Sequence, residues 1–507
     1  MQVERFSYAT TDQALIGRSN IDPSTPDIMS ASVFLCAGTA NYIRGVCLAA
    51  EGGTLASLQF GCFMTHKINF HELADLSAAQ RAKLHQRAEA DLSAFEVKVR
   101  PIIDAVRADG DEALVRFARE FDKARVNASE IAATEADFDA AEKTLDPKVR
   151  EAMEFAAYSI RKFHQDQMPE DMWLHEIRPG AFAGDRTRPI PSVACYVPRG
   201  KGSFPSVALM TAIPAKVAGV KDVIIITPPG PNGKIDDATL VAARMAGVSK
   251  VFKAGGAQGI AAVAYGTQTI PKVAKVIGPG SPWVAAAKRL VSHVLDTGSP
   301  AGPSEVIIFA DDTVSGALAG LDLLVEAEHG PDSSAYLVTW SRRVAQQAIA
   351  AIPEYWKQMS EQRVAFSSAV LGGPIGGVVL ARDEEDAIAF CNEYAPEHLE
   401  VLSKEPFTYL GRLEHAGEIL LGEHTPTTLG NYVIGPNHVL PTSGWARTAS
   451  AVSVFDFLKR NSIAYVTSKG YPELAKHAHA LATYEGFDGH ANAVSETRTK
   501  LLKLSTN

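Results

Sequence analysis

Short apolar runs alternate with helix-length stretches from Val193 onward, and this alternation constrains the fold more than any other feature of the sequence. The first series of runs is VACYVP, DVIIITPP, SKVFKAGG and AKVIGPG, each followed by a stretch with helical spacing. A second series from Glu305 contains EVIIFA, AYLVTW and GVVLA. Strands separated by helices of this length pair in parallel. The pattern predicts two successive α/β domains with parallel sheets, which an old duplication would explain.

The segments that flank the two α/β series differ from them in pattern. Helical periodicity predicts helices at Leu76–Asp109, Asp111–Phe121, Glu135–Leu145 and Lys148–Gln165. Residues 1–63 have weak periodicity and few charges, and we interpret them as an extension upstream of a natural start at Met64. The alternative is a genuine but weakly patterned arm. After Ser450 we expect a largely helical, polar tail.

Composition and charge exclude several function classes. The chain has 507 residues, of which 46% are hydrophobic and 21% charged, as in ordinary globular proteins of two or three domains. A formal net charge of −9 argues against nucleic acid as the main partner. The five cysteines include no C-x-x-C pair, and no apolar run is long enough to span a membrane. We therefore expect a cytoplasmic protein with neither a nucleic-acid nor a membrane partner.

Glu326 and His329 are the first elements of a candidate metal site. They follow an apolar strand and stand on a stretch with helical spacing, where residues three apart share a face. A carboxylate and an imidazole placed in this way can bind one cation. For an isolated Glu-x-x-His pair, the alternative is a solvated carboxylate beside a core histidine. Further candidate groups at Glu397, His398 and His438, and at His490 in the tail, favour the metal site.

Two further segments carry groups that suit proton transfer. Glu397 and His398 follow Pro396, which suits the first turn of a helix. An imidazole of near-neutral pKa can accept a proton from an alcohol, and a neighbouring carboxylate can activate water; a capping Glu beside a partly buried His is the alternative. Asn431 and His438 belong to GNYVIGPNHVLPT, a Gly/Pro-rich loop of the kind that often holds functional groups. A loop held by Asn side-chain hydrogen bonds is the alternative there.

Glycine-bearing turns follow three of the expected strands: YVPRG from Tyr196, GGAQ ending at Gln258 and GPGS ending at Ser281. Ligands of open parallel sheets bind at the carboxyl ends of strands, where glycine lets backbone N–H groups approach phosphates. The fingerprint G-x-G-x-x-G is absent, so ordinary loop connections are the alternative.

Eight motifs, taken in order, resemble the histidinol dehydrogenase family: YVPRGKGSFPS, AGGAQGIAAVAYG, IPKVAKVIGPG, AGPSEV, AEHGPDS, YAPEHLE, GNYVIGPNHVLPT and EGFDGHANAV. The resemblance covers roughly residues 76–504. It implies an α/β fold with two incomplete Rossmann-like domains, and a zinc enzyme that reduces NAD twice while oxidising an amino alcohol, through an aldehyde, to a carboxylate. It also implies an intertwined homodimer whose tail enters the partner's site, which would give a tail histidine a function.

The resemblance implies a division into domains as well. It places a small helical segment at 64–91 and a first α/β domain, with the metal and acid/base residues, at 92–195 plus 303–448. A second α/β domain that binds NAD covers 196–302, and a dimer-exchanging tail covers 449–507.

Site residues follow from the same resemblance. The zinc positions are Glu326, His329, Asn431 and His490. The acid/base pair is Glu397 and His398. The four zinc positions also bind substrate, together with Ser304, His438 and Glu485. The cofactor positions are Tyr196, Gln258 and Ser281.

Several of these positions depart from the family pattern. Glu326 replaces a metal-bound Gln and Asn431 a metal-bound Asp, so the metal ligands keep one carboxylate, one amide and two imidazoles. Thr427 replaces a carboxylate beside the substrate, Ser281 an Asn at the cofactor and Arg199 a Gly. Loss of an acidic group should weaken recognition of a substrate ammonium. Family members with altered pockets oxidise 2,3-dihydroxypropane-1-sulfonate (sulfopropanediol) to sulfolactate, which makes that alcohol the alternative substrate to L-histidinol.

Two other functions fit parts of the sequence. A zinc hydrolase would use the same metal without a nicotinamide, and the loops at Tyr196 and Gln258 argue against it. A non-catalytic binding protein would keep the fold but not the chemistry. Four retained residues argue against that: Glu397, His398, His329 and His490. NADH formation and zinc binding discriminate the three.

Overall fold

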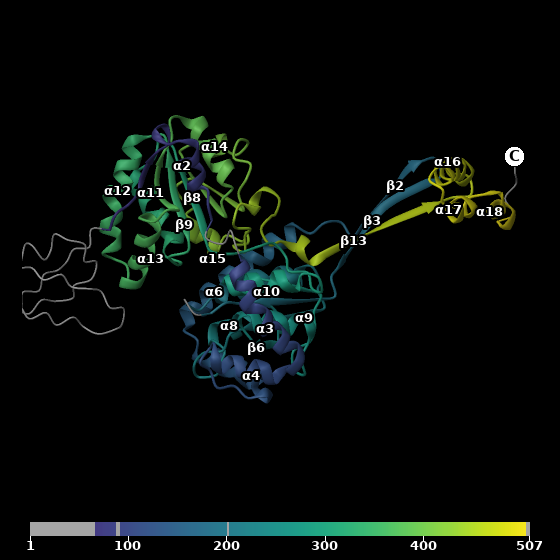
Figure 1. Cartoon of the computed structure of the whole chain (residues 1–507), viewed down its shortest axis with the longest axis horizontal. Helices are drawn as coiled ribbons and strands as arrows, with labels where there is room; N and C mark the ends of the chain where they lie inside the picture. The colour runs from purple at the N-terminus through teal and green to yellow at the C-terminus, as the bar shows by residue number, and fades with distance from the viewer. Residues whose placement is uncertain (1–65, 88–91, 200–201, 503–507) are drawn as a thin grey trace, which may run out of the picture. The chain divides into compact units, whose positions relative to one another are not determined.

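The computed structural model describes residues 66–87, 92–199 and 202–502 (Figure 1). Backbone contacts divide the chain into Met1–Thr65 and His66–Asn507, and every described residue belongs to the second unit. The described residues form two parallel sheets and one antiparallel sheet. The extension expected at 1–63 lies outside the described residues.

A four-stranded parallel sheet forms from the first α/β series, as predicted. Its order is β6-β5-β4-β7, with β4 (Ser192–Tyr196), β5 (Asp222–Thr227), β6 (Val251–Lys253) and β7 (Lys275–Ile277). The connecting helices are α7 (Pro205–Val217), α8 (Asp237–Met245), α9 (Gly256–Tyr265) and α10 (Pro282–Val291). Val193 and Cys195 belong to one core cluster and Ala194 to another, because successive side chains point to opposite faces. Both faces are covered, which explains the continuous apolar runs.

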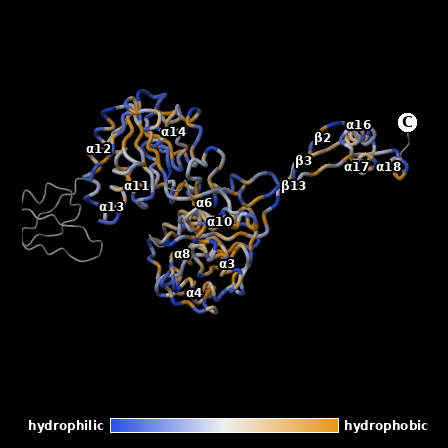
Figure 2. Tube along the Cα trace, viewed as in Figure 1, coloured by the Kyte–Doolittle hydropathy of each residue, from blue (hydrophilic) through white to orange (hydrophobic). Residues whose placement is uncertain are grey.

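The second series forms a six-stranded parallel sheet in the order β1-β10-β9-β8-β11-β12. Its strands are β1 (Phe70–Glu72), β8 (Glu305–Ala310), β9 (Ser334–Thr339), β10 (Gly376–Leu380), β11 (His398–Leu402) and β12 (Glu418–Leu421). Helices α11 (Gly316–Ala327), α12 (Arg342–Trp356) and α13 (Glu361–Leu371) cover one face. Helices α14 (Glu384–Tyr394) and α2 (Ala78–Leu84) cover the other. Figure 2 shows hydrophobic residues concentrated along the strands between these helices.

The N-terminal helices differ from the predicted ones at one point. A single helix over Leu76–Asp109 is wrong: α2 ends at Leu84 and α3 (Ser93–Asp109) begins after a break. The others are α4 (Asp111–Glu120), α5 (Glu135–Thr144) and α6 (Pro147–Asp166), close to the predicted bounds. Helices α3 to α6 pack with the four-stranded sheet, whereas β1 pairs with the six-stranded sheet. The division into domains at 92–195 and 303–448 stays a prediction.

The antiparallel sheet, in the order β13-β3-β2, was not predicted. It joins β2 (Met172–Arg178) and β3 (Ala181–Pro189) to β13 (Leu458–Val466), which lies in the tail expected to be largely helical. The rest of the tail is helical, with α16 (Tyr471–Tyr484), α17 (Asp488–Ala493) and α18 (Glu496–Leu501). Every residue of β2 is exposed in the single chain, so the strand has no buried face that would produce an alternating apolar pattern in the sequence.

Two negative expectations concern the described residues. None of their helices combines the length and the apolar character needed to cross a membrane. Their two cysteines, Cys195 and Cys391, are free and buried.

Candidate active site

The candidate acid/base residues lie where strands of the six-stranded sheet begin. His398 is the first residue of β11, and its Cα is paired with Val306 of β8 and with Glu418 of β12. The expected helix after Pro396 is therefore wrong, because pairing with both neighbouring strands holds this segment extended. Parallel sheets usually bind ligands at the opposite, carboxyl ends of their strands. At the amino ends, the C-terminus of α11 approaches instead, and its dipole favours a cation.

One hydrogen-bonded cluster lies at the amino ends of these strands. It consists of Glu326, His329, Asn431 and Ser304. Glu326 stands in the last turn of α11, and His329 lies in the turn beyond the helix rather than on it. The Nδ1 atom of His329 lies 2.8 Å from Glu326 Oε2 and 2.8 Å from Ser304 Oγ. Asn431 Nδ2 donates to Glu326 Oε1 at 2.8 Å. Asn431 comes from the short helix α15 (Thr427–Tyr432), not from a loop as expected.

Glu397 and His398 lie beside this cluster, and both are buried. Glu397 Oε2 accepts a hydrogen bond from the backbone N–H of Glu305 at 2.9 Å. The Nε2 atom of His398 is 4.0 Å from Glu397 Oε1 and 4.0 Å from Glu326 Oε1. Its Nδ1 atom is 3.0 Å from Glu418 Oε2. The imidazole therefore presents one nitrogen to the cluster and keeps the other on a carboxylate.

Burial and neighbouring charges move the pKa of each group. Burial raises the pKa of Glu397 to about 8. Burial alone would lower the pKa of His398, but the hydrogen bond to Glu418 and the charges of Glu326 and Glu397 raise it to about 9. Burial alone would raise the pKa of Glu326, yet the charge and hydrogen bond of His329 hold it well below its usual range. A buried carboxyl and a buried imidazole whose pKa values are both shifted by their neighbours are candidates for general acid–base chemistry.

Two other predicted positions differ in how they face the cluster. His438 donates from Nδ1 to the carbonyl oxygen of Asn431 at 2.5 Å, and its Nε2 atom is buried without a protein partner. Thr427 is fully buried, and its N–H and hydroxyl both donate to Glu400 Oε2 at 3.0 Å. Both hydrogen-bond donors of Thr427 are thus used by the buried carboxylate of Glu400.

The tail residues Glu485 and His490 are not brought to the cluster. Both are exposed, and within the described residues neither side chain makes a hydrogen bond or an ion pair with the cluster. The only ring that His490 approaches there is that of Phe487, 5.2 Å away. Their assignment to the site stays a prediction that requires a second copy of the chain.

The donor set of the cluster fits zinc. Glu326, His329 and Asn431 supply a carboxylate, an imidazole and an amide, which are nitrogen and oxygen donors that zinc accepts. In the described part of the chain, no three His, Cys, Asp or Glu side chains gather as a metal cluster. One of the three donors, Asn431, is an amide and is not of those residue types. Zinc is usually four-coordinate, so a fourth donor is needed from His490 or from substrate.

The predicted cofactor positions lie at the carboxyl ends of strands of the four-stranded sheet. Tyr196 ends β4, Gln258 stands in the first turn of α9, and Ser281 is the N-cap of α10 after β7. The Tyr196 hydroxyl accepts from the N–H of Gly256 at 3.2 Å. The chain runs from β4 to β5 and β6 on one side of β4, and returns to β7 on the other. Ligands of such sheets bind at this reversal of strand order.

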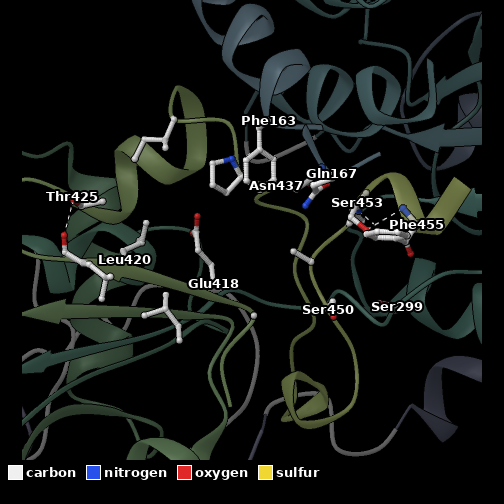
Figure 3. Close-up of a pocket in the computed structure, with 18 residues that line it drawn as sticks. Phe163, Gln167, Ser299, Glu418, Leu420, Thr425, Asn437, Ser450, Ser453 and Phe455 are labelled. Carbon is white, nitrogen blue, oxygen red and sulfur yellow. Dashed lines mark hydrogen bonds between the residues drawn. The ribbon is translucent and has the colours of Figure 1, made fainter. Parts of the chain in front are cut away.

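A cavity of about 810 Å³ opens beside Glu418 and contains space for a small ligand. Its lining includes Phe163 of α6, Gln167 just after that helix, Leu420 of β12 and Asn437. Figure 3 shows the Glu418 side chain projecting from its strand between Leu420 and Asn437. The sequence offered no sign of Glu418, because it opens an ordinary apolar strand run, EILL, without a motif around it.

Comparison with known proteins agrees with the motifs. The family model described as "Histidinol dehydrogenase" matches residues 85–498. This chain belongs to the histidinol dehydrogenase family. "Histidinol dehydrogenase homolog 2" of Mesorhizobium japonicum is 61% identical to it, over 86% of this chain and 99% of the relative. "Histidinol dehydrogenase" of Synechocystis sp. is 47% identical, over 85% and 99%. The crystal structure of histidinol dehydrogenase from Elizabethkingia anophelis has a TM-score of 0.81 and 32% identity, over 86% and 99% of the two chains.

Membership in this family supports a dehydrogenase, and the structural likeness confirms the α/β, Rossmann-like architecture with parallel sheets. The metal, the cofactor, the substrate and the homodimer are matters of proposal.

Proposed function

We propose that this chain is a zinc- and NAD-dependent dehydrogenase that oxidises a primary alcohol, through a retained aldehyde, to a carboxylate. The family's reference reaction, L-histidinol to L-histidine, is the first candidate. One observation carries the proposal: His398 directs Nε2 at Glu397 and Glu326, beside the three-donor cluster that fits zinc. One alcohol, two NAD⁺ and one water then give one carboxylate, two NADH and three protons.

The groups that the chain would bind supply defined chemistry. NAD⁺, held near Tyr196, Gln258 and Ser281, would supply the hydride acceptor for each oxidation. Zinc, held by Glu326, His329 and Asn431, would supply a Lewis acid that orients the substrate. All proton transfers fall to side chains of the protein.

His398 and Glu397 divide those proton transfers. The Nε2 atom of His398 accepts the hydroxyl proton in the first oxidation, while Nδ1 stays on Glu418. Glu397, held by the N–H of Glu305, then takes a proton from the water that adds to the aldehyde. His398 accepts the hydroxyl proton of the resulting hydrate in the second oxidation. The burial of both groups excludes bulk water and supports retention of the reactive aldehyde.

Sulfopropanediol remains the second candidate substrate, on a specific observation. Thr427, which stands where the family pattern has a substrate-facing carboxylate, is buried and bonded to Glu400. A site that lacks this acid has less attraction for an ammonium group. The carboxylate of Glu418 beside His398 works in the opposite direction, because it would repel a sulfonate. The two alcohols therefore have to be compared directly.

Substitution of His398 tests the acid/base assignment. With zinc-loaded protein, NAD and the better alcohol, His398→Gln should lower kcat by about 10²–10⁴-fold, the usual contribution of a general base. His293→Gln is the matched control, because His293 is exposed and is not one of the residues of the cluster. A Glu397→Gln variant should keep the first oxidation and release aldehyde, since only hydration needs this carboxylate. Full activity of His398→Gln would refute the assignment.

A further inference from the structure

Glu418 is not among the residues that the family resemblance assigns, yet it touches His398. It is the first residue of β12 and lies opposite His398 in the parallel ladder. Its Oε2 atom is 3.0 Å from Nδ1 of the imidazole, and the residue is only 9% exposed. A buried carboxylate is costly unless it is paired, so this contact is the main stabilising partner of the Glu418 side chain.

We propose that Glu418 is a positioning residue for His398, fixing the imidazole through Nδ1 so that Nε2 faces the reacting group. The inference rests on the proposed function, in which Nε2 accepts the hydroxyl proton. Rotation about the bond to an imidazole ring is broad and roughly two-fold, so packing alone leaves two ring orientations open. The hydrogen bond to Glu418 selects one of them and places the proton on Nδ1.

The surroundings of Glu418 hold its carboxylate in place. Helix α15 passes over it at Gly430, where a Cβ would lie 2.9 Å from Oε1 and 3.0 Å from Oε2. Only glycine leaves this space to the carboxylate. The β12 backbone anchors the other end of the side chain through its pairing with β11. The acceptor is thus confined between a helix and a strand, as positioning to a fraction of an ångström requires.

The second oxygen of Glu418 connects this pair to the cavity. Oε1 is buried and has no hydrogen-bond partner in the protein, and Glu418 lines the cavity of about 810 Å³ (Figure 3). Unpartnered buried oxygens mark a place for water or a ligand group. A small carboxylate can therefore reach the position that Glu418 occupies if its side chain is removed.

The charge of Glu418 also bears on catalysis. When Nε2 accepts the substrate proton, the imidazole becomes a cation, and the Nδ1–H bond to Oε2 becomes charge-assisted. Such bonds are shorter and roughly twice as strong as neutral ones. Glu418 therefore stabilises the state that forms during proton transfer more than the resting state, which appears in kcat rather than in KM.

Three variants of the full-length, zinc-loaded chain test the proposal. Glu418→Ala should lower kcat by about 10²-fold. The KM for NAD should not change, because the predicted cofactor positions belong to the four-stranded sheet and Glu418 to the six-stranded one. Glu418→Gln keeps an acceptor oxygen without the charge, and its kcat should fall between that of the Ala variant and the wild type. Glu423→Gln is the control: it substitutes a partly exposed Glu, five residues on, that pairs with Lys404. Added formate should restore part of the lost kcat in Glu418→Ala and have no effect on Glu423→Gln.

Crystal structures of the wild type and of Glu418→Ala give a readout that does not depend on activity. We expect the His398 ring to keep its orientation in the first and to rotate or become disordered in the second, with formate returning it. An unmoved ring, or an equal loss of kcat in all three variants without formate rescue, would overturn the positioning role. If the wild type oxidises no alcohol, the proposed function fails, and the ring orientation still decides the role of Glu418.

Discussion

The buried Arg87–Glu305 pair offers a sharp test of how the edge of the active site is stabilised. Their side chains are 9% and 4% exposed, and Arg87 Nε lies 2.8 Å from Glu305 Oε1. Arg87 also donates to the carbonyl oxygen of Tyr394 at 2.6 Å, and its guanidinium lies 3.4 Å from the centroid of that ring. Arg87→Met keeps much of the apolar volume and leaves Glu305 charged and unpaired by any cation. Breaking a buried pair in this way should lower the free energy of unfolding by about 3–5 kcal/mol.

The assay is equilibrium urea unfolding at one fixed protein concentration, followed by tryptophan fluorescence. Arg342→Met is the control, because Arg342 pairs with Glu72 at 2.7 Å but is 55% exposed; it should cost less than about 1 kcal/mol. Burial already raises the pKa of Glu305, and removal of Arg87 raises it further. The loss in Arg87→Met should therefore shrink as the pH falls and Glu305 becomes neutral. Equal losses in the two variants, or a loss independent of pH, would refute the reasoning.

Two further predictions concern the four-stranded sheet. Gly278→Ala should destabilise the protein on the order of 3 kcal/mol and raise the KM for NAD, because Gly278 has φ +124° and a Cβ would lie 2.2 Å from the carbonyl oxygen of Tyr196. Gly411→Ala, with nothing within 4 Å, should be neutral in both measurements, and equal behaviour of the two variants would contradict this account. Burial, and secondarily the charge of Lys275, lower the pKa of Lys288 to about 8 from its ordinary value of 10.5. The buried ammonium therefore destabilises the folded state at low pH, and this destabilisation disappears above the pKa that Lys288 has in the unfolded chain. Between pH 8 and 10.5, the free energy of unfolding of the wild type should therefore rise by about 3 kcal/mol relative to that of Lys288→Met. A difference between the two proteins that does not change with pH would contradict the lowered pKa of Lys288.

The two parallel sheets could be predicted because their strands are buried on both faces. Runs such as VACYVP and EVIIFA are continuous and apolar, and their helices have clear periodicity. The strands β2, β3 and β13 lack that signal: β2 is exposed along its whole length in the single chain, and β13 is nearly so. An alternating pattern needs a covered face, and β2 and β13 have none within one chain.

Prediction of local structure failed at two residues of the site. The family resemblance grouped Glu326, His329 and Asn431, whose side chains are hydrogen-bonded neighbours in the structure, and their role as metal ligands stays a prediction. The sequence pattern placed His329 on a helix and Asn431 in a loop, and the structure shows neither. Periodicity does not say where a helix ends to within a residue or two. Glu418 was missed because its role depends on register: only the pairing of β11 with β12 brings its carboxylate opposite His398.

The number of NADH molecules formed per alcohol tests the central claim most directly. Zinc-loaded full-length protein should be incubated with excess NAD and a limiting amount of L-histidinol or, separately, of sulfopropanediol, with NADH and carboxylate product measured together. We predict two NADH per carboxylate from one of the two alcohols, with no free aldehyde released. One NADH per alcohol with the aldehyde as product would contradict the two-step oxidation, and no NADH from either alcohol would contradict both candidate substrates.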